Sequence, residues 1–421
     1  MIGEHVLTIA GVDVSCLVDR ASITHGRGDT SGQPEASAIT VDITVGPGTP
    51  LPAAVDIGAP LTVDTHLGAV VSRRFTGTIT DVSLGWKDAG EDTPDTGIGQ
   101  IVAVGPLADY GRRVIGDVPF PQELDGARVA RVFNAAGLVL DPAFSDPGTV
   151  QVIPRDVDAR AALEVATDTA VSAGGLIWET RAGDIRYADA VHRRGAAVAL
   201  ELDACDILVT PTWARNTGGL VNDLSIAYGV TPAGGGERPT YRASNPASSG
   251  RYGRYEYSAT VELADLVDVT AAANLILVQN GRPVWLLQAL PIDVAGLDET
   301  ETATLLALDM HGLLRVTGLP TTGQTPVNVV AWVEGWTETL AWGVHDLELW
   351  VSDYCRTSPP PRWNDVPPET TWDTVPPATT WDSAACMGPP TDFGRWDDVS
   401  ATTRWDQVPA DVEWDEAGVL L

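Results

Sequence analysis

The segment from Ser22 to Val45 constrains the fold more than any other part of the sequence. Its second half alternates strictly, and one face carries only apolar residues: Ile39, Val41, Ile43 and Val45. This period of two is typical of a β-strand with one buried face. The preceding stretch, 26–35, is rich in glycine and also holds a proline, which predicts a long turn-rich loop. A short alternating run, 21–25, leads into it, so the unit is predicted to be strand, loop, strand.

The length and composition favour a folded protein built from many short strands. With 421 residues, of which 44% are hydrophobic and 20% charged, the chain can bury a large core and is expected to hold about two to four domains. Its 42 glycines and 30 prolines indicate frequent turns. We see no membrane-spanning apolar run and no secretory leader, and expect a protein made and folded in a cytoplasm.

The net charge of −31 argues against a protein that binds nucleic acids. Binding to phosphates requires lysine and arginine side chains, and Lys87 is the only lysine. An acidic surface can still line a passage for DNA, because like charges repel the phosphates and offer them no place to bind. Solubility explains the charge equally well, and the sequence leaves both explanations open.

No set of residues matches a catalytic or metal-binding pattern. The cysteines lie too far apart for a C-x-x-C motif, and the six histidines show no paired ligand spacing. The sequence contains neither a G-x-S-x-G elbow nor a Walker loop. We therefore expect no enzyme activity, no metal and no cofactor, and keep a cell-wall hydrolase only as a minor hypothesis that zymography would test.

Hydrophobic periodicity divides the folded part of the chain into three regions. Region 1–115 is predicted to be all-β, with a change of parity before Val82 that suggests a bulge. Region 116–215 is predicted to be a small α+β module with two helices and a hairpin at 176–188. Asp125 is expected to cap the first helix, with Gly137 just beyond its end.

The second helix of the module is predicted to start near Asp156 or Asp158 and to end at Gly174. Region 216–355 is predicted to return to β structure, starting with a strand at 224–228. A long loop at 230–251 is expected to follow this strand, with one helix near 270–280 further on. The segment 327–333 is apolar on both faces and predicts a strand that is covered on both sides, by a sandwich core or by a subunit interface.

The final region, 356–421, follows a stiff proline linker and carries a tryptophan repeat. Tryptophans recur every nine residues in two runs: Trp363, Trp372 and Trp381, then Trp396, Trp405 and Trp414. Prolines and the lack of a helical stripe predict an extended arm. Six tryptophans are too apolar for a free tail, so we expect the indoles to be buried on another surface. That surface is a neighbouring protein in one interpretation and host cell-wall sugar in the other.

The string I-x-H-G-R-x-D, followed by Q-P, resembles the start of minor tail proteins, or baseplate hubs, of long-tailed actinobacterial phages. The matching positions form the family-motif loop: His25, Gly26, Arg27, Asp29, Gln33 and Pro34. Later segments are similar to other parts of this family, and the resemblance covers roughly residues 1–354. Within this motif, we expect His25 to brace the loop through a hydrogen bond.

The resemblance implies a mainly β fold with a small α+β insertion. It implies two β-barrel-like tube domains of the hub type, at 1–115 and 216–355, with the module 116–215 between them and the arm 356–421 at the end. It further implies a homotrimer at the tail tip, with six barrels facing a hexameric tail tube. No peptidase or muramidase domain, as found in some hubs, is recognisable here.

The implied function is structural. Such a protein joins the tail tube to the tip, contacts the tube proteins above and the tip proteins below, and surrounds a channel through which DNA passes without specific binding. It is part of the virion and is assembled in the host cytoplasm. The alternative hypothesis is an adhesin that binds host cell-wall glycans through the C-terminal tryptophan repeat.

Overall fold

The computed structural model describes residues 4–28, 32–46, 48–87, 96–116, 118–193, 196–206, 211–231, 236–287, 289–320, 325 and 327–354. In the described residues from Glu4 to Val104 the regular elements are mainly strands. They are β1 (Glu4–Ile9), β2 (Val12–Asp13), β3 (Val18–Gly26), β4 (Glu35–Val45), β5 (Pro60–Leu67), β6 (Val70–Lys87) and β7 (Thr96–Val104), with a single 3-10 turn at Ser15–Leu17.

Strand β4 shows why these residues form a sheet. Its odd-numbered positions from Ser37 to Val45 are all buried, whereas its even-numbered positions are half-buried or exposed. The predicted alternation is therefore confirmed, and each buried aliphatic side chain contributes about 1.5–3 kcal/mol to folding. The predicted bulge is also confirmed, because the register between β6 and β7 shifts between Ile79 and Asp81.

The segments 198–206 and 289–353 supply further strands to the same sheet. They are β14 (Val198–Asp203), β20 (Ala289–Asp293), β21 (Leu313–Thr317), β22 (Val329–Ala341) and β23 (Val344–Asp353), accompanied by helix α6 (Glu299–Ala307) and 3-10 turns at Ala204–Asp206 and Val294–Gly296. Helix α6 begins with a capping box, in which Asp298 and Glu301 bond each other's backbone N–H groups.

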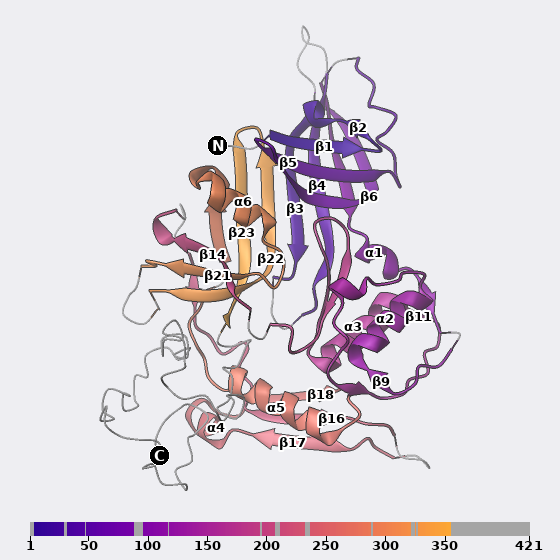
Figure 1. Ribbon diagram of the computed structural model, residues 1–421, viewed down its shortest axis with the longest axis vertical. Coiled ribbons are helices and arrows are strands. Elements are labelled where there is room, and N and C mark those ends of the chain that lie inside the picture. Colours follow the sequence, from indigo (N-terminus) through magenta and orange to yellow (C-terminus); the bar gives the residue numbers. More distant parts are fainter. Residues whose placement is uncertain are drawn as a thin grey trace.

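Both sets of strands belong to one large mixed sheet (Figure 1). Twelve strands pair in the order β14-β21-β22-β3-β4-β7-β6-β5-β1-β2, with β23 beside β22 and β20 beside β23. The mainly β fold is therefore confirmed. Within the described ranges the strand pairing leaves the sheet open, so the expected barrels are not present as closed, separate units.

The predicted α+β module follows β7. It contains α1 (Leu107–Tyr110), β8 (Val114–Ile115), β9 (Glu123–Leu124), α2 (Asp125–Ala135), a 3-10 turn (Pro142–Phe144), β10 (Gln151–Val152), β11 (Arg160–Ala161), α3 (Ala162–Ala173), β12 (Leu176–Glu179) and β13 (Ile185–Ala188). Helices α2 and α3 pack on each other and on the β12–β13 hairpin. The predicted hairpin is confirmed.

A smaller layer lies at the far end of the molecule from the β1–β2 edge (Figure 1). It contains β16 (Asp223–Ala227), β17 (Thr240–Ser244), α4 (Pro246–Tyr252), β18 (Glu256–Thr260) and α5 (Leu266–Asn280). The short strands β15 (Trp213–Ala214) and β19 (Leu286–Leu287) pair with each other, and Leu287 is buried in the same core cluster as Leu290 and Leu349 of the large sheet. Helix α5 buries Val269, Ala273 and Leu277 against Leu224 and Ile226 of the three-stranded sheet β17-β16-β18.

Three local predictions were wrong. Asp125 does not cap α2: it lies inside the helix, fully buried, and its carboxylate accepts hydrogen bonds from the backbone N–H groups of Thr149 and Val150. Helix α3 begins at Ala162, because the residues before it pair as β11. The segment 230–251 is not one long loop, since it contains β17 and most of α4.

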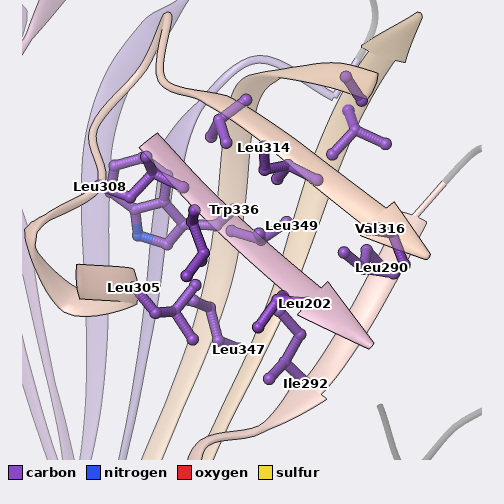
Figure 2. Packing of buried hydrophobic residues seen from close by; sticks show 14 of the residues in the cluster. Leu202, Leu290, Ile292, Leu305, Leu308, Leu314, Val316, Trp336, Leu347 and Leu349 are labelled. Atoms are coloured by element: carbon purple, nitrogen blue, oxygen red, sulfur yellow. The ribbon is translucent and has the colours of Figure 1, made fainter. Parts of the chain in front are cut away.

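The largest core cluster lies where β14, β21, β22 and β23 meet helix α6. Figure 2 shows Leu202 and Leu314 on the neighbouring parallel strands β14 and β21, Leu305 on the helix, and Trp336 beneath them. The predicted burial of both faces of the strand near 327–333 is confirmed, because Ala331, Trp332 and Val333 are all buried in succession. This core fixes β22, which carries the charged residues considered next.

Candidate functional site

Strand β22 connects the first and last thirds of the chain. Its first half pairs with β21, its second half pairs with β3, and its other edge pairs with β23. The register places Gly335 opposite Gly26 and Trp336 opposite His25. We use the term joint for the region where β3, β22 and β23 meet the module, and its charged core consists of His25, Arg27, Arg74, Arg181, Arg193, Glu334 and Glu338.

Within the joint, the family-motif loop contacts β22 through the backbone of Gly26 and Arg27. Gly26 has a φ of +81°, and a Cβ at this position would lie only 2.5 Å from the backbone oxygen of Glu334. Only glycine fits this combination of a left-handed backbone and contact with a neighbouring strand. The backbone N–H of Arg27 donates to the same oxygen at 2.9 Å, so the end of β3 is held directly against β22.

Glu334 is the centre of the first ion-pair cluster. Arg27 and Arg193 both donate to its carboxylate, with nitrogen–oxygen distances of 2.7–2.9 Å, and the Ser352 hydroxyl also donates to it. Burial by itself would raise the pKa of this carboxyl, but Arg193 and Arg27 outweigh it and hold the pKa well below its usual range. Glu334 is therefore a buried anion that requires both cations.

Glu338, four residues after Glu334 in β22, is the centre of a second ion-pair cluster. Arg74 of β6 binds its carboxylate through two nitrogens, at 2.7 and 2.9 Å, and His345 donates from Nε2 at 2.7 Å. Burial opposes ionisation, yet Arg74 and His345 hold the pKa of Glu338 well below its ordinary value. The His345 ring in turn contacts His5 of β1, with centroids 5.0 Å apart.

His25 and Arg181 fill the space beside these clusters. The His25 ring stacks on Trp336 with centroids 4.4 Å apart, and the Arg181 guanidinium lies 3.9 Å from the Trp336 ring centroid. Burial lowers the pKa of His25 to about 4, only partly offset by Asp309, so its imidazole is neutral in the folded protein. Burial, together with Arg74, likewise lowers the pKa of Arg181 to about 9.

Gln33 connects the family-motif loop to the inserted module. Its amide donates to the backbone oxygen of Gly175 at 2.8 Å and accepts from the N–H of Ile177 at 3.2 Å, as a neighbouring strand would. His25 also forms a hydrogen bond with the backbone of Glu179, in the same hairpin. The loop therefore contacts both β22 and the module.

Glu179 provides a second connection to the module. Its carboxylate accepts from the backbone N–H groups of Ser37 and Leu107, each at 2.6 Å. Burial raises the pKa of Glu179, although these hydrogen bonds partly counteract the effect. Gly105 gives the carboxylate room, because a Cβ there would lie 1.7 Å from the Glu179 Oε1 atom.

The structure brings most of the predicted loop residues together. His25, Gly26 and Arg27 lie in the joint, Gln33 binds the module, and Pro34 is buried. Asp29 and the six repeat tryptophans, Trp363, Trp372, Trp381, Trp396, Trp405 and Trp414, lie outside the described residues.

Sequence reasoning missed the partners Arg74, Arg193, Glu334 and Glu338. The sequence did contain one signal for them, since two glutamates lie in a strand that is apolar on both faces. Buried carboxylates must be paired, so such glutamates predict arginine partners from elsewhere in the chain.

The chemistry of the joint is structural. The carboxylates of Glu334 and Glu338 are each occupied by guanidinium groups, so neither is free to act as a general acid or base. In the described ranges, no group of three or more His, Cys, Asp or Glu side chains could hold a metal ion. No helix in those ranges is long and apolar enough to cross a membrane. The arrangement serves to fix three parts of the chain relative to one another.

Neither a protein-family model nor a curated protein matches the sequence. Solved structures do match. The 43 kDa tail protein of prophage MuSo2 from Shewanella oneidensis aligns with a TM-score of 0.58, over 84% of this chain and 99% of that chain, at 13% identity. The chain has the fold of phage tail proteins.

Two further structures share this tail-protein fold. The tail protein from Neisseria meningitidis MC58 aligns with a TM-score of 0.57 at 13% identity, over 85% of this chain and 98% of that chain. The prophage tail protein gp18 from Listeria monocytogenes EGD-e aligns with a TM-score of 0.51 at 8% identity, over 83% and 95% of the two chains. The likeness therefore extends over nearly the whole of each tail protein.

Proposed function

We propose that the chain is a structural virion protein of the phage tail tip, a baseplate hub or minor tail protein that joins the tail tube to the tip. The observation that carries this proposal is the tail-protein fold, shared over 84% of this chain and 99% of the MuSo2 tail protein. The family-motif loop supports an origin in a long-tailed actinobacterial phage. Fold alone does not fix function, so the proposal also needs surfaces suited to assembly.

Two hairpins supply such surfaces. Trp342, at the tip between β22 and β23, is 99% exposed, and Trp86, near the end of the long strand β6, is 71% exposed. Tryptophan is enriched among the residues that dominate binding at protein interfaces. In this proposal the joint holds both pairs of strands in fixed positions, and their exposed tryptophans, Trp86 and Trp342, contact neighbouring tail proteins.

The assembled form in this proposal is a homotrimer that surrounds the DNA channel. The net charge of −31 suits a lumen that DNA passes without binding, because acidic walls repel phosphates. The arm 356–421 then contacts adjacent tail proteins through its six tryptophans. The role is non-enzymatic, in keeping with carboxylates of the joint that are all engaged by arginines.

The tryptophan repeat also favours one alternative, a host cell-wall glycan-binding adhesin. Binding of residues 356–421 to purified host cell-wall polysaccharide tests it, with a variant in which the six tryptophans are replaced by leucine as control. Retention that depends on the indoles would support the adhesin. Equal recovery of both forms in the unbound fraction would refute it.

Immunogold labelling of virions tests the tail-tip proposal. Antibodies against residues 1–354 should decorate the distal end of the tail of particles whose genome encodes this chain. The control is a particle assembled without the gene for the chain, which should remain unlabelled. Particles that lack the protein, or that carry it on the capsid, would refute the proposal.

A further inference from the structure

Helix α5 exposes an apolar face on the side that points away from its sheet. Its inner face packs on the three-stranded sheet β17-β16-β18, along which the helix lies in Figure 1. One turn apart on the opposite side are four exposed residues that we call the outer stripe: Val267, Ala271, Asn274 and Val278. Val267 is 78% exposed and Val278 is 46% exposed. The outer stripe is therefore accessible to a partner.

The composition of α5 is unusual for a helix at a protein surface. Such a helix normally carries charged residues on the face that points away from the core. Asp268 is the only charged residue among the 15 residues of α5, and Asn274 is the only polar residue of the outer stripe. Helices that are apolar on both faces are typically buried on both sides. We therefore expect the outer stripe to be covered in solution.

The charges near α5 favour an acidic occupant. Residues 211–287 carry six arginines and six acidic side chains, so this part is neutral in a chain with a net charge of −31. At the C-terminal end of α5, Arg251 and Arg282 are exposed, and no carboxylate in the described ranges pairs with them. Arg251 belongs to α4, whose Ser248 hydroxyl donates to the backbone oxygen of Gly281 directly after α5. The outer stripe thus ends beside two cations that can attract an acidic segment.

The chain itself contains a segment with this chemistry. Residues 363–381 carry the first run of repeat tryptophans, three acidic residues and no basic residue. The described part of the chain ends at Tyr354, just after β23, and β23 contacts β19, which begins six residues after α5. Trp363 lies nine residues beyond Tyr354, which a fully extended chain can span over about 30 Å.

The spacing of the tryptophans suits the length of the helix. With 15 residues, α5 is about 22 Å long. Nine residues of polyproline-like chain advance about 28 Å, so two successive indoles of the first run can reach the two ends of the outer stripe. Val267 and Val278 lie near these ends.

We propose that, in the chain before assembly, residues 363–381 lie along the outer stripe of α5. The indoles contact Val267 and Val278, and the acidic residues face Arg251 and Arg282. This contact buries apolar surface on both partners, and the charges set the direction of the segment. The arm is thereby held on its own chain until a neighbouring protein competes for it. The contact goes beyond the tail-tip role and does not depend on it.

Photocrosslinking of the full chain tests the contact directly. The photoreactive residue p-benzoylphenylalanine is placed at position 267, and position 139 in the module is the control, because Val139 is 76% exposed. Equal amounts of ¹⁵N-labelled and unlabelled chain are mixed before irradiation, so that peptide masses identify the captured segment and the chain it belongs to. We expect position 267 to capture residues 363–381 of the same chain, and position 139 not to capture them.

Matched variants test the contribution of the indoles. Replacement of the three tryptophans of the first run (W363A, W372A and W381A) should speed hydrogen exchange in α5 by at least about fivefold, because the helix loses its cover. The control replaces the three tryptophans of the second run by alanine and should leave exchange in α5 unchanged.

Arginine variants test the contribution of charge. R251Q combined with R282Q should lower the crosslink yield from position 267 by about twofold or more, as expected for the loss of exposed ion pairs. R242Q is the control, because Arg242 lies on the opposite face of the three-stranded sheet from α5, and it should leave the yield unchanged.

Three results would overturn the proposal. Capture of a segment of another chain by position 267 would make the outer stripe a contact between copies. Capture of a different segment of the same chain, or of none, would show that residues 363–381 do not lie on α5. Equal exchange rates of α5 in the two tryptophan variants would show that the first run does not cover the helix.

Discussion

Replacement of Glu334 by glutamine is the sharpest test of the joint. Glu334 is 1% exposed, and its carboxylate is shared by two buried guanidinium groups, those of Arg27 and Arg193. E334Q keeps the shape but leaves both cations without an anion. Removal of one partner from a buried ion pair typically costs about 3–5 kcal/mol, a large share of the roughly 5–15 kcal/mol that stabilises a folded domain.

The assay is urea unfolding followed by tryptophan fluorescence, with the midpoint and slope compared between variants. E201Q is the matched control, because Glu201 pairs with Arg315 at 2.7 Å on the surface, where such a pair contributes about 0–1 kcal/mol. We expect E334Q to unfold at a clearly lower urea concentration than E201Q. A loss of stability in E334Q no greater than that in E201Q would show that Arg27 and Arg193 do not require the Glu334 carboxylate.

Three further predictions concern the family-motif loop. G26A should destabilise more than G11A, since both glycines have a φ of +81° but only Gly26 is crowded; equal losses in thermal unfolding would contradict the crowding. Because the pKa of His25 falls from 6.5 to about 4 on folding, the unfolded chain binds more protons in that window, so stability is complete above pH 6.5 and declines toward pH 4. H25Q should flatten this slope in urea titrations at successive pH values, and an unchanged slope would be inconsistent with a buried neutral imidazole. Q33A should speed hydrogen exchange in β12, whereas Q100A, which loses an exposed contact, should not; equal exchange in both would disprove the bracing role.

Local patterns predicted individual elements well. The alternation of β4 and the apolar stripe of α2 each depend on residues within one strand or helix, so the sequence contains the whole signal. The segment 230–251 was predicted to be a loop because it is rich in glycine and serine. It also contains the start signal of a helix, which the prediction did not use. Asn245 caps α4 by accepting from the N–H of Ser248, with Pro246 at the first helical position.

The joint could not be predicted in the same way. Arg27 and Glu334 are 307 residues apart in the sequence, and Arg74 and Glu338 are 264 residues apart. Periodicity shows which face of a strand is buried but not which distant strand will lie beside it. The resemblance of the motif loop indicated where the important residues lie, whereas the ion pairs that make them important became visible only from the register of β22 against β3.

The most direct test of the tail-hub account is the mass of the purified chain in solution, measured with and without residues 356–421. A tail hub of this kind is expected to form a particle of three chains in both forms, because self-assembly would reside in the β regions and the arm would contact other tail proteins. Loss of the trimer on truncation would show that residues 356–421, and not the β regions, hold the three chains together. A monomer in both forms would contradict the homotrimer and favour the adhesin.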